Sequence, residues 1–202
     1  MYEQFRRYFS SYPIISTKEI MRVIPSFDAK NLVYWQKKGY IQKLRNGFYV
    51  FNNTEWSEER LYRIANTLYS PSYISLESAF QFYNFIPEGV FSFHSVSTLK
   101  TNRFTTDIGT FQYKTIKRSL FFGYKLIEMN GIRFRMATLE KAILDYLYLN
   151  PHVNDLEHLR SLRWSKTELA SLNQAELKDY QSLYNSPTIN RKIELLKQYL
   201  DD

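Results

Sequence analysis

The first 52 residues carry an ordered series of helix and turn signals that leaves little freedom in how they fold. Residues 16–19 read Ser-Thr-Lys-Glu, a capping box in which the serine hydroxyl accepts from a first-turn amide while the glutamate reaches back. Pro25 ends that helix, and Gly39 closes the following one as a left-handed stop. An Asn46-Gly47 pair between two β-prone runs predicts a tight hairpin. The segment is therefore expected to form short helices followed by a β-hairpin.

The spacing of these signals predicts a winged helix-turn-helix over residues 1–52. Only about three residues, around Pro25 and Ser26, separate the second helix from the third, and such a tight connection is typical of a helix-turn-helix. Ser26 is expected to cap the third helix, and the hairpin after Gly39 is expected to form the wing. The three expected helices run over residues 2–9, 16–24 and 27–38.

Positive charge is concentrated in the same segment. Residues 1–52 contain nine basic and three acidic side chains, so they carry +6 of the net charge of +7. A basic module joined to a nearly neutral one is expected where one of the two meets a polyanion such as double-stranded DNA.

The residues of the third helix and the hairpin have the chemistry that DNA recognition uses. Lysines neutralise phosphates, an asparagine such as Asn31 can read an adenine edge, and Tyr34 can contact a phosphate or a thymine methyl group. Basic residues near a hairpin tip can hold a flanking phosphate or enter the minor groove. The candidate DNA-binding residues are Lys30, Asn31, Val33, Tyr34, Lys37, Lys38, Lys43, Arg45 and Asn46.

Composition excludes several other classes of protein. The chain has no cysteine, so disulfides, thiol catalysis and thiolate metal sites are ruled out. Three histidines, His94, His152 and His158, are too few and too scattered to predict a metal site, and no cofactor is expected. No window has the apolar length of a signal peptide or a membrane span, so we expect a cytoplasmic protein that does not engage membranes.

Residues 53–202 alternate helical and strand-like stretches. This pattern predicts a larger α+β module, in which a small, mostly antiparallel sheet packs on helices. Ser57 is expected to cap a helix that Ser70-Pro71 ends, and turns at 107–109 and 129–131 are expected to close two hairpins. Further helices are expected over residues 76–83, 138–149, 155–162, 167–172 and 189–200.

The second module also contains recognisable motifs, concentrated between residues 73 and 149. They are ISLESA at 74–79, IPEGVF at 86–91, the segment 95–98, the Gly-Thr-Phe turn at 109–111, and LEKA at 139–142 with Leu144-Asp145. Following a winged helix, these motifs resemble the AbiEi family of antitoxins from bacterial abortive-infection toxin–antitoxin systems, over essentially the whole chain. The chain departs from that family at Tyr83-Asn84, where a His-Gly pair is common, and at residues 137–139, where prolines are common.

The resemblance implies a function for each module. It implies that residues 1–52 bind operator DNA, often an inverted repeat, as a repressor of the protein's own operon. It implies that residues 53–202 form the antitoxin domain, which counteracts a cognate nucleotidyltransferase-like toxin.

A second basic segment lies within the larger module. Residues 93–135 hold eight basic and two acidic side chains. This surface could face an acidic toxin, add phosphate contacts or be simply solvated, and the sequence leaves the three open. The candidate partner-binding residues are Lys100, Arg103, Lys117 and Arg118.

Catalysis is not predicted. Glu140 and Asp145 lie five residues apart on one expected helix, well off a common face, and are expected to pair with bases such as Lys141 or Arg135. The sequence also lacks a phosphate-binding glycine loop, a nucleophile elbow and the Asp-x-Asp pattern of nucleotidyltransferases. The alternative to an antitoxin and repressor is a winged-helix component of a nucleic-acid-processing enzyme.

Overall fold

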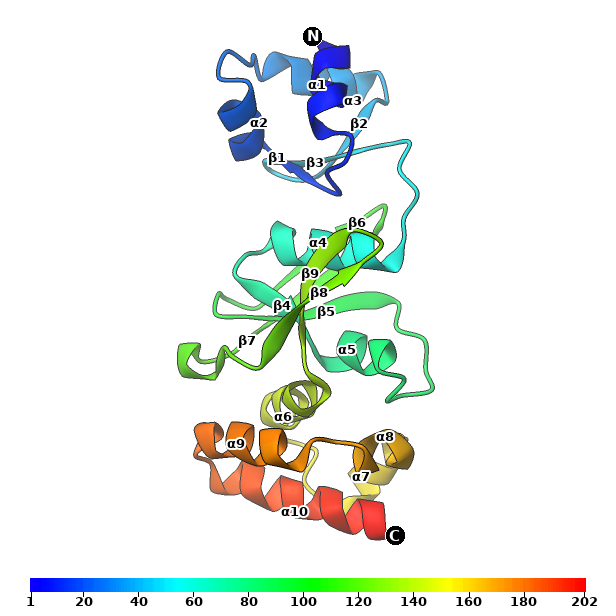
Figure 1. Ribbon diagram of the computed structural model, residues 1–202, viewed down its shortest axis with the longest axis vertical. Helices are drawn as coiled ribbons and strands as arrows, with labels where there is room; N and C mark the ends of the chain where they lie inside the picture. The colour runs from blue at the N-terminus through cyan, green and yellow to red at the C-terminus, as the bar shows by residue number, and fades with distance from the viewer.

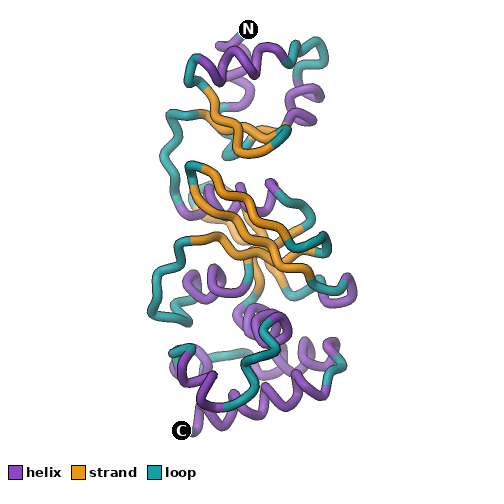
Figure 2. Tube along the Cα trace, turned by 180° about the vertical axis from the view of Figure 1, so that it is seen from behind, coloured by secondary structure: helices purple, strands orange, loops and turns teal.

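The computed structural model describes all 202 residues, Met1–Asp202, and its two termini lie at opposite ends of an elongated molecule (Figure 1). Three helices and a three-stranded sheet form the N-terminal end, which we call the N-terminal module. A six-stranded sheet with helices on both faces occupies the middle, and a group of helices forms the C-terminal end (Figure 2). We call the middle and C-terminal parts together the second module.

The N-terminal module contains the helices and the hairpin that the sequence predicts. Its three strands are antiparallel in the order β1-β3-β2. The capping box is present, since Glu19 N donates to Ser16 Oγ over 3.2 Å and Ser16 N donates to Glu19 Oε2 over 2.9 Å. The elements are α1 (Tyr2–Phe9), β1 (Ile15–Ser16), α2 (Thr17–Val23), α3 (Lys30–Lys37), β2 (Ile41–Arg45) and β3 (Phe48–Phe51).

The connection between α2 and α3 is longer than expected. Six residues, 24–29, join the two helices, and Ser26 does not cap α3. The side chain of Phe27 is buried, and its amide donates a 3.0 Å hydrogen bond to Ile24 O in the connection between the helices. Instead, Asp28 Oδ1 accepts a 2.9 Å hydrogen bond from Lys30 N, which satisfies the first free amide of α3.

The second module contains a mixed sheet of six strands in the order β6-β7-β5-β4-β9-β8. The β5–β7 and β4–β9 pairs are parallel and the other three pairs are antiparallel, so the sheet is mixed and larger than expected, with antiparallel pairs in the majority. The sequence does not predict β4, a strand of three residues that lies between β5 and β9. The strands are β4 (Ser72–Ile74), β5 (Ser92–Ser97), β6 (Asn102–Thr106), β7 (Gly109–Thr115), β8 (Tyr124–Met129) and β9 (Ile132–Ala137).

Helices cover both faces of this sheet. On the face toward the N-terminal module lies α4, and on the opposite face lie α5 and α6, beyond which the remaining helices pack (Figure 1). Helix α9 was not predicted, and the other helices fall close to their expected positions. The helices are α4 (Glu58–Leu68), α5 (Leu76–Phe82), the 3₁₀ helix η1 (Arg118–Leu120), α6 (Leu139–Leu149), α7 (Leu156–Ser161), α8 (Lys166–Ala170), α9 (Gln174–Tyr184) and α10 (Pro187–Asp201).

The three-stranded sheet of the N-terminal module is buried on both faces. Ile15, Ile41 and Tyr49 pack with the helices of that module, whereas Leu44 and Val50 belong to the main core of the second module. Successive residues of a strand point to opposite faces, so one short sheet can serve two cores at once. The two modules are therefore packed against each other, and the sheet of the N-terminal module contributes to both hydrophobic cores.

Candidate nucleic-acid interface

Helix α3 presents one face to the core and the other to solvent. Leu32 and Trp35 are buried against the aromatic side chains of α1, where Phe5 lies 4.7 Å from Trp35 between ring centroids. The residues that follow a helical stripe on the opposite side are all exposed, and more than half of the surface of Val33 and Tyr34 is accessible. The exposed candidates of this helix are Lys30, Val33, Tyr34, Lys37 and Lys38.

This exposed stripe, which we call the α3 face, is strongly basic. It carries three lysines, and none of them forms an ion pair with an acidic side chain. Lys38 Nζ lies 5.7 Å from the ring centroid of Tyr34, so the charge and the aromatic ring occupy the same part of the surface. The major groove of double-stranded DNA is wide enough for an α-helix, and the positive charge of the α3 face is complementary to the phosphates that border the groove.

Asn31 differs from its neighbours on α3. Its side-chain amide donates a 3.0 Å hydrogen bond to the carbonyl oxygen of Asp28, and the residue is half-buried. A bidentate contact to adenine needs both the amide and the carbonyl of the side chain. Asn31 therefore braces the start of α3 through one amide hydrogen, while its Oδ1 forms no hydrogen bond within the protein, so the base-reading role expected from the sequence stays a prediction.

The hairpin of β2 and β3 divides the remaining candidates. Lys43 and Asn46 are exposed, but Arg45 is turned toward the second module. Arg45 Nη1 donates a 2.7 Å hydrogen bond to Leu68 O at the end of α4. The Arg45 guanidinium also lies 4.6 Å from the ring centroid of Phe104. One donor of the Arg45 guanidinium is thus used between the modules, and because the group has further N–H donors, its expected phosphate contact stays a prediction.

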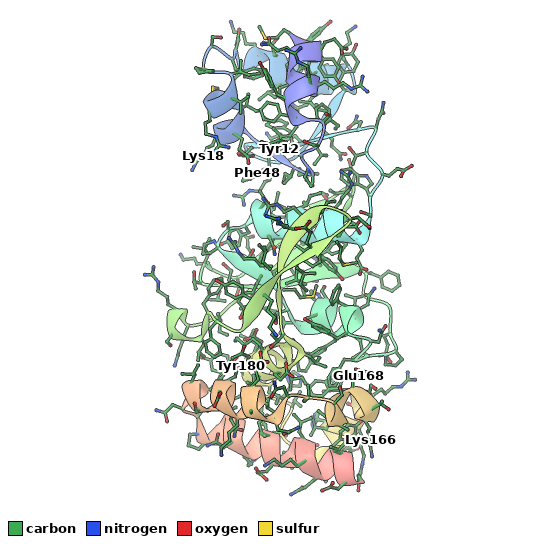
Figure 3. All side chains as sticks on the ribbon, in the orientation of Figure 1. Tyr12, Lys18, Phe48, Lys166, Glu168 and Tyr180 are labelled. Atoms are coloured by element: carbon green, nitrogen blue, oxygen red, sulfur yellow. The ribbon has the colours of Figure 1, made fainter.

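Other contacts hold the hairpin in the same position. Gln42 Nε2 donates a 2.5 Å hydrogen bond to Asp107 Oδ2 in the β6–β7 turn. Phe48, labelled in Figure 3, lies between the two modules, with the Arg45 guanidinium 5.5 Å from its ring centroid. The hairpin is thus a connector as well as an exposed edge, and its fully exposed candidates are Lys43 and Asn46.

The candidate partner-binding residues lie in the second module, beyond the hairpin. Lys100 follows β5, Arg103 is on the edge strand β6, and Lys117 and Arg118 begin η1 after β7. All four are exposed and none forms an ion pair. Thr115 Oγ1 donates to Leu99 O over 2.8 Å, which places the end of β7 beside the residues that precede Lys100.

The carboxylates of α6 are structural in this geometry. Asp145 is fully buried and pairs with Lys141, as the sequence predicts, and it accepts 2.9 Å hydrogen bonds from the hydroxyls of Tyr73, Ser75 and Tyr184. Burial lowers the pKa of Lys141, against the opposing effect of Asp145. Glu140 accepts a 2.8 Å hydrogen bond from Asn173 N rather than pairing with a base.

One polar pair escaped the sequence analysis. His94 on β5 lies with Nδ1 at 2.7 Å from Oε2 of Glu77 on α5, although the two residues are 17 positions apart. Only the strand-and-helix packing brings them together, so no local pattern signalled the pair. No group of three or more His, Cys, Asp or Glu side chains is arranged to hold a metal ion.

Neither family models nor curated proteins identify a relative of this chain. No family model matches the chain, and no curated protein matches it significantly. None of the helices combines the length and the apolar character needed to cross a membrane.

Proposed function

We propose that this protein is a DNA-binding antitoxin and autorepressor, whose N-terminal module is a winged helix-turn-helix. The observation that carries the DNA-binding part is the α3 face, where lysines and Tyr34 are exposed on a helix whose other side is fixed in an aromatic core. The order of α1, β1, α2, α3 and a hairpin, with β3 between β1 and β2, supports the winged-helix assignment.

On this proposal α3 enters the major groove. Lys30, Lys37 and Lys38 neutralise phosphates on the two sides of the groove, and Tyr34 and Val33 approach the base edges. Lys43 adds a flanking phosphate contact from the exposed side of the hairpin. An operator with inverted repeats would take two copies of the chain.

The antitoxin part rests on the resemblance of residues 73–149 to AbiEi antitoxins. The proposed partner is a nucleotidyltransferase-like toxin, and the exposed, unpaired bases Lys100, Arg103, Lys117 and Arg118 supply a surface for an acidic protein. These bases and the α3 face belong to different parts of the molecule, so the two activities can be separated by mutation.

The DNA-binding part is tested with the duplex that precedes the protein's own gene. A Tyr34→Ala/Lys37→Ala variant should shift this duplex only at much higher protein concentration in a gel-shift assay. Lys178→Ala removes an equally exposed lysine from α9 and serves as the matched control. If the double variant and the control bind alike, α3 does not read DNA.

The antitoxin part is tested in cells by expressing the neighbouring gene alone and together with this protein. The neighbour should arrest growth by itself, and the wild-type chain should restore growth. Arg103→Glu/Arg118→Glu should lose this rescue and retain repression, because it leaves the α3 face intact. A neighbour that is harmless without this protein would refute the antitoxin assignment.

A further inference from the structure

A hollow lies on the face of the six-stranded sheet that carries α5 and α6, beside the end of α6. Its volume is about 220 Å³, and its polar lining comes from Glu77, His94, Gln112, Lys114 and Asn150. A second hollow of about 340 Å³ adjoins the same place, because Glu77 and His94 line it as well. We call the two together the α5 cleft.

Strand pairing explains why polar groups gather there. His94 on β5 is the direct neighbour of Gln112 on β7, and Lys114 lies two residues further along the same face of β7. The opposite face of these strands is apolar, with the rings of Phe93 and Phe111 stacked at 5.3 Å. The sheet therefore turns a row of polar side chains toward the helices at a place that they do not cover.

The Glu77 carboxylate is already occupied within the cleft. It lies 2.7 Å from His94 Nδ1 without the alignment of a hydrogen bond, and His94 Nε2 has no partner inside the protein either. Burial would raise the pKa of Glu77, but the contact with His94 and the charge of Lys114 hold this pKa below its ordinary value. Lys114 forms no ion pair within 4 Å, so its ammonium group is free to contact a ligand, with the Glu77 carboxylate elsewhere in the same cleft.

The other half of the cleft is more apolar, although Glu88 and Ser161 also line it. Ile86, Val90 and Leu162 line it, above the ring of Trp164. The loop that forms this wall is tied down, since Arg163 Nη1 lies 2.9 Å from Glu88 Oε1 and Val90 N donates a 2.9 Å hydrogen bond to Gln81. A site with a few converging polar groups beside an apolar wall is typical of pockets for small organic ligands.

The backbone around the cleft is strained. Leu76 precedes Glu77 with φ of 55°, and Arg163 adjoins Leu162 with φ of 53°. Neither residue is a glycine or an asparagine, and a left-handed conformation is unfavourable for such residues because Cβ approaches the carbonyl oxygen that follows. Strain of this kind persists where the surrounding packing imposes it, often beside binding sites.

From these observations we propose that the α5 cleft is a binding site for a small organic anion, one that joins a phosphate or carboxylate group to an apolar ring or chain. The anionic group contacts Lys114, His94 Nε2 and the Gln112 amide, and the apolar part lies against Ile86 and Leu162. This site is independent of the α3 face, so it stands or falls separately from the proposed DNA binding.

The test uses the full chain and the three histidine ring signals in NMR spectra. His94→Gln identifies the His94 signal, while His152 and His158, whose rings lie 6.2 Å apart elsewhere, serve as internal references. Phenyl phosphate and inorganic phosphate are the probes, since they share the anionic group and differ in the apolar part. We expect both to shift the His94 signal saturably, with phenyl phosphate the tighter ligand.

Two substitutions then assign the two halves of the cleft. Lys114→Ala, at an exposed position, should weaken both probes about tenfold, the loss expected for one charge-assisted contact. Leu162→Ser should weaken phenyl phosphate alone, and Lys178→Ala should change neither. The proposal is overturned if neither probe shifts His94, if both bind equally well, or if Lys114→Ala leaves their affinities unchanged.

Discussion

Arg45 and Lys43 are two bases of the same strand for which the structure predicts opposite consequences of mutation. Replacing either by methionine removes the charge and keeps an unbranched side chain of similar length. Arg45→Met removes the donor to Leu68 O and the stacking over Phe104, whereas Lys43→Met changes only an exposed side chain.

The magnitude follows from the contacts that each variant loses. A hydrogen bond from a charged donor contributes roughly 1.5–3 kcal/mol, and the part-buried cation above Phe104 contributes about 0.5–1 kcal/mol more. The weaker contacts of Arg45 with Phe48 and Tyr69, at 5.5 and 5.9 Å, add little to this. We therefore expect Arg45→Met to lower the free energy of unfolding by about 2–4 kcal/mol, and Lys43→Met to change it by less than about 0.5 kcal/mol.

Urea unfolding followed by tryptophan fluorescence measures the two stabilities, and fluorescence anisotropy with a labelled duplex measures DNA affinity. Arg45→Met should bind DNA almost normally under conditions where it is folded, and Lys43→Met should bind more weakly with unchanged stability. The reasoning is refuted if Arg45→Met keeps its full stability and loses DNA affinity, since Arg45 would then be a phosphate contact after all.

Three further predictions concern stability. Lys141→Met should lower the free energy of unfolding by about 3–5 kcal/mol, because it leaves the Asp145 charge buried without its partner. In urea unfolding, Lys141→Met/Asp145→Leu should recover most of that loss. A double variant as unstable as the single one would contradict this. Burial raises the pKa of Tyr83 and Tyr146 to about 12, above the value of about 10 in an unfolded chain. The stability that comes from keeping these two tyrosines protonated in the folded chain is therefore complete below about pH 10 and is lost as the pH rises toward 12. Tyrosinate absorbance should grow together with loss of helical circular dichroism, not before it. Ser16→Ala removes the capping box and should cost about 1 kcal/mol, and an unchanged melting temperature would argue against its role.

The local signals of the sequence were sufficient for most elements of the N-terminal module. The capping box at Ser16 and the Gly39 stop act through backbone geometry within a few residues, and both lie where expected. Ser26 does not cap α3, because the helix begins at Lys30 and Asp28 Oδ1 accepts the hydrogen bond from the Lys30 amide instead.

Long-range pairing was beyond the reach of the sequence. The strand β4 has only three residues and no alternation to reveal it, yet it joins β5 to β9 and so makes one six-stranded sheet. The side chain of Arg45 has the chemistry of a phosphate contact. Only the fold, which brings Leu68 and Phe104 beside it, shows that it joins the modules. The Glu77–His94 pair likewise depends on how α5 lies on β5.

The salt dependence of DNA binding tests the central proposal most directly. Each phosphate contact made by a lysine contributes a slope of about −0.9 to the logarithm of affinity against the logarithm of salt concentration. Lys30→Ala/Lys37→Ala should reduce the magnitude of this slope by about two contacts and weaken binding to every duplex, with Lys178→Ala as the control. The same slope and affinity in all three proteins would contradict the assignment of the α3 face as the surface that binds DNA.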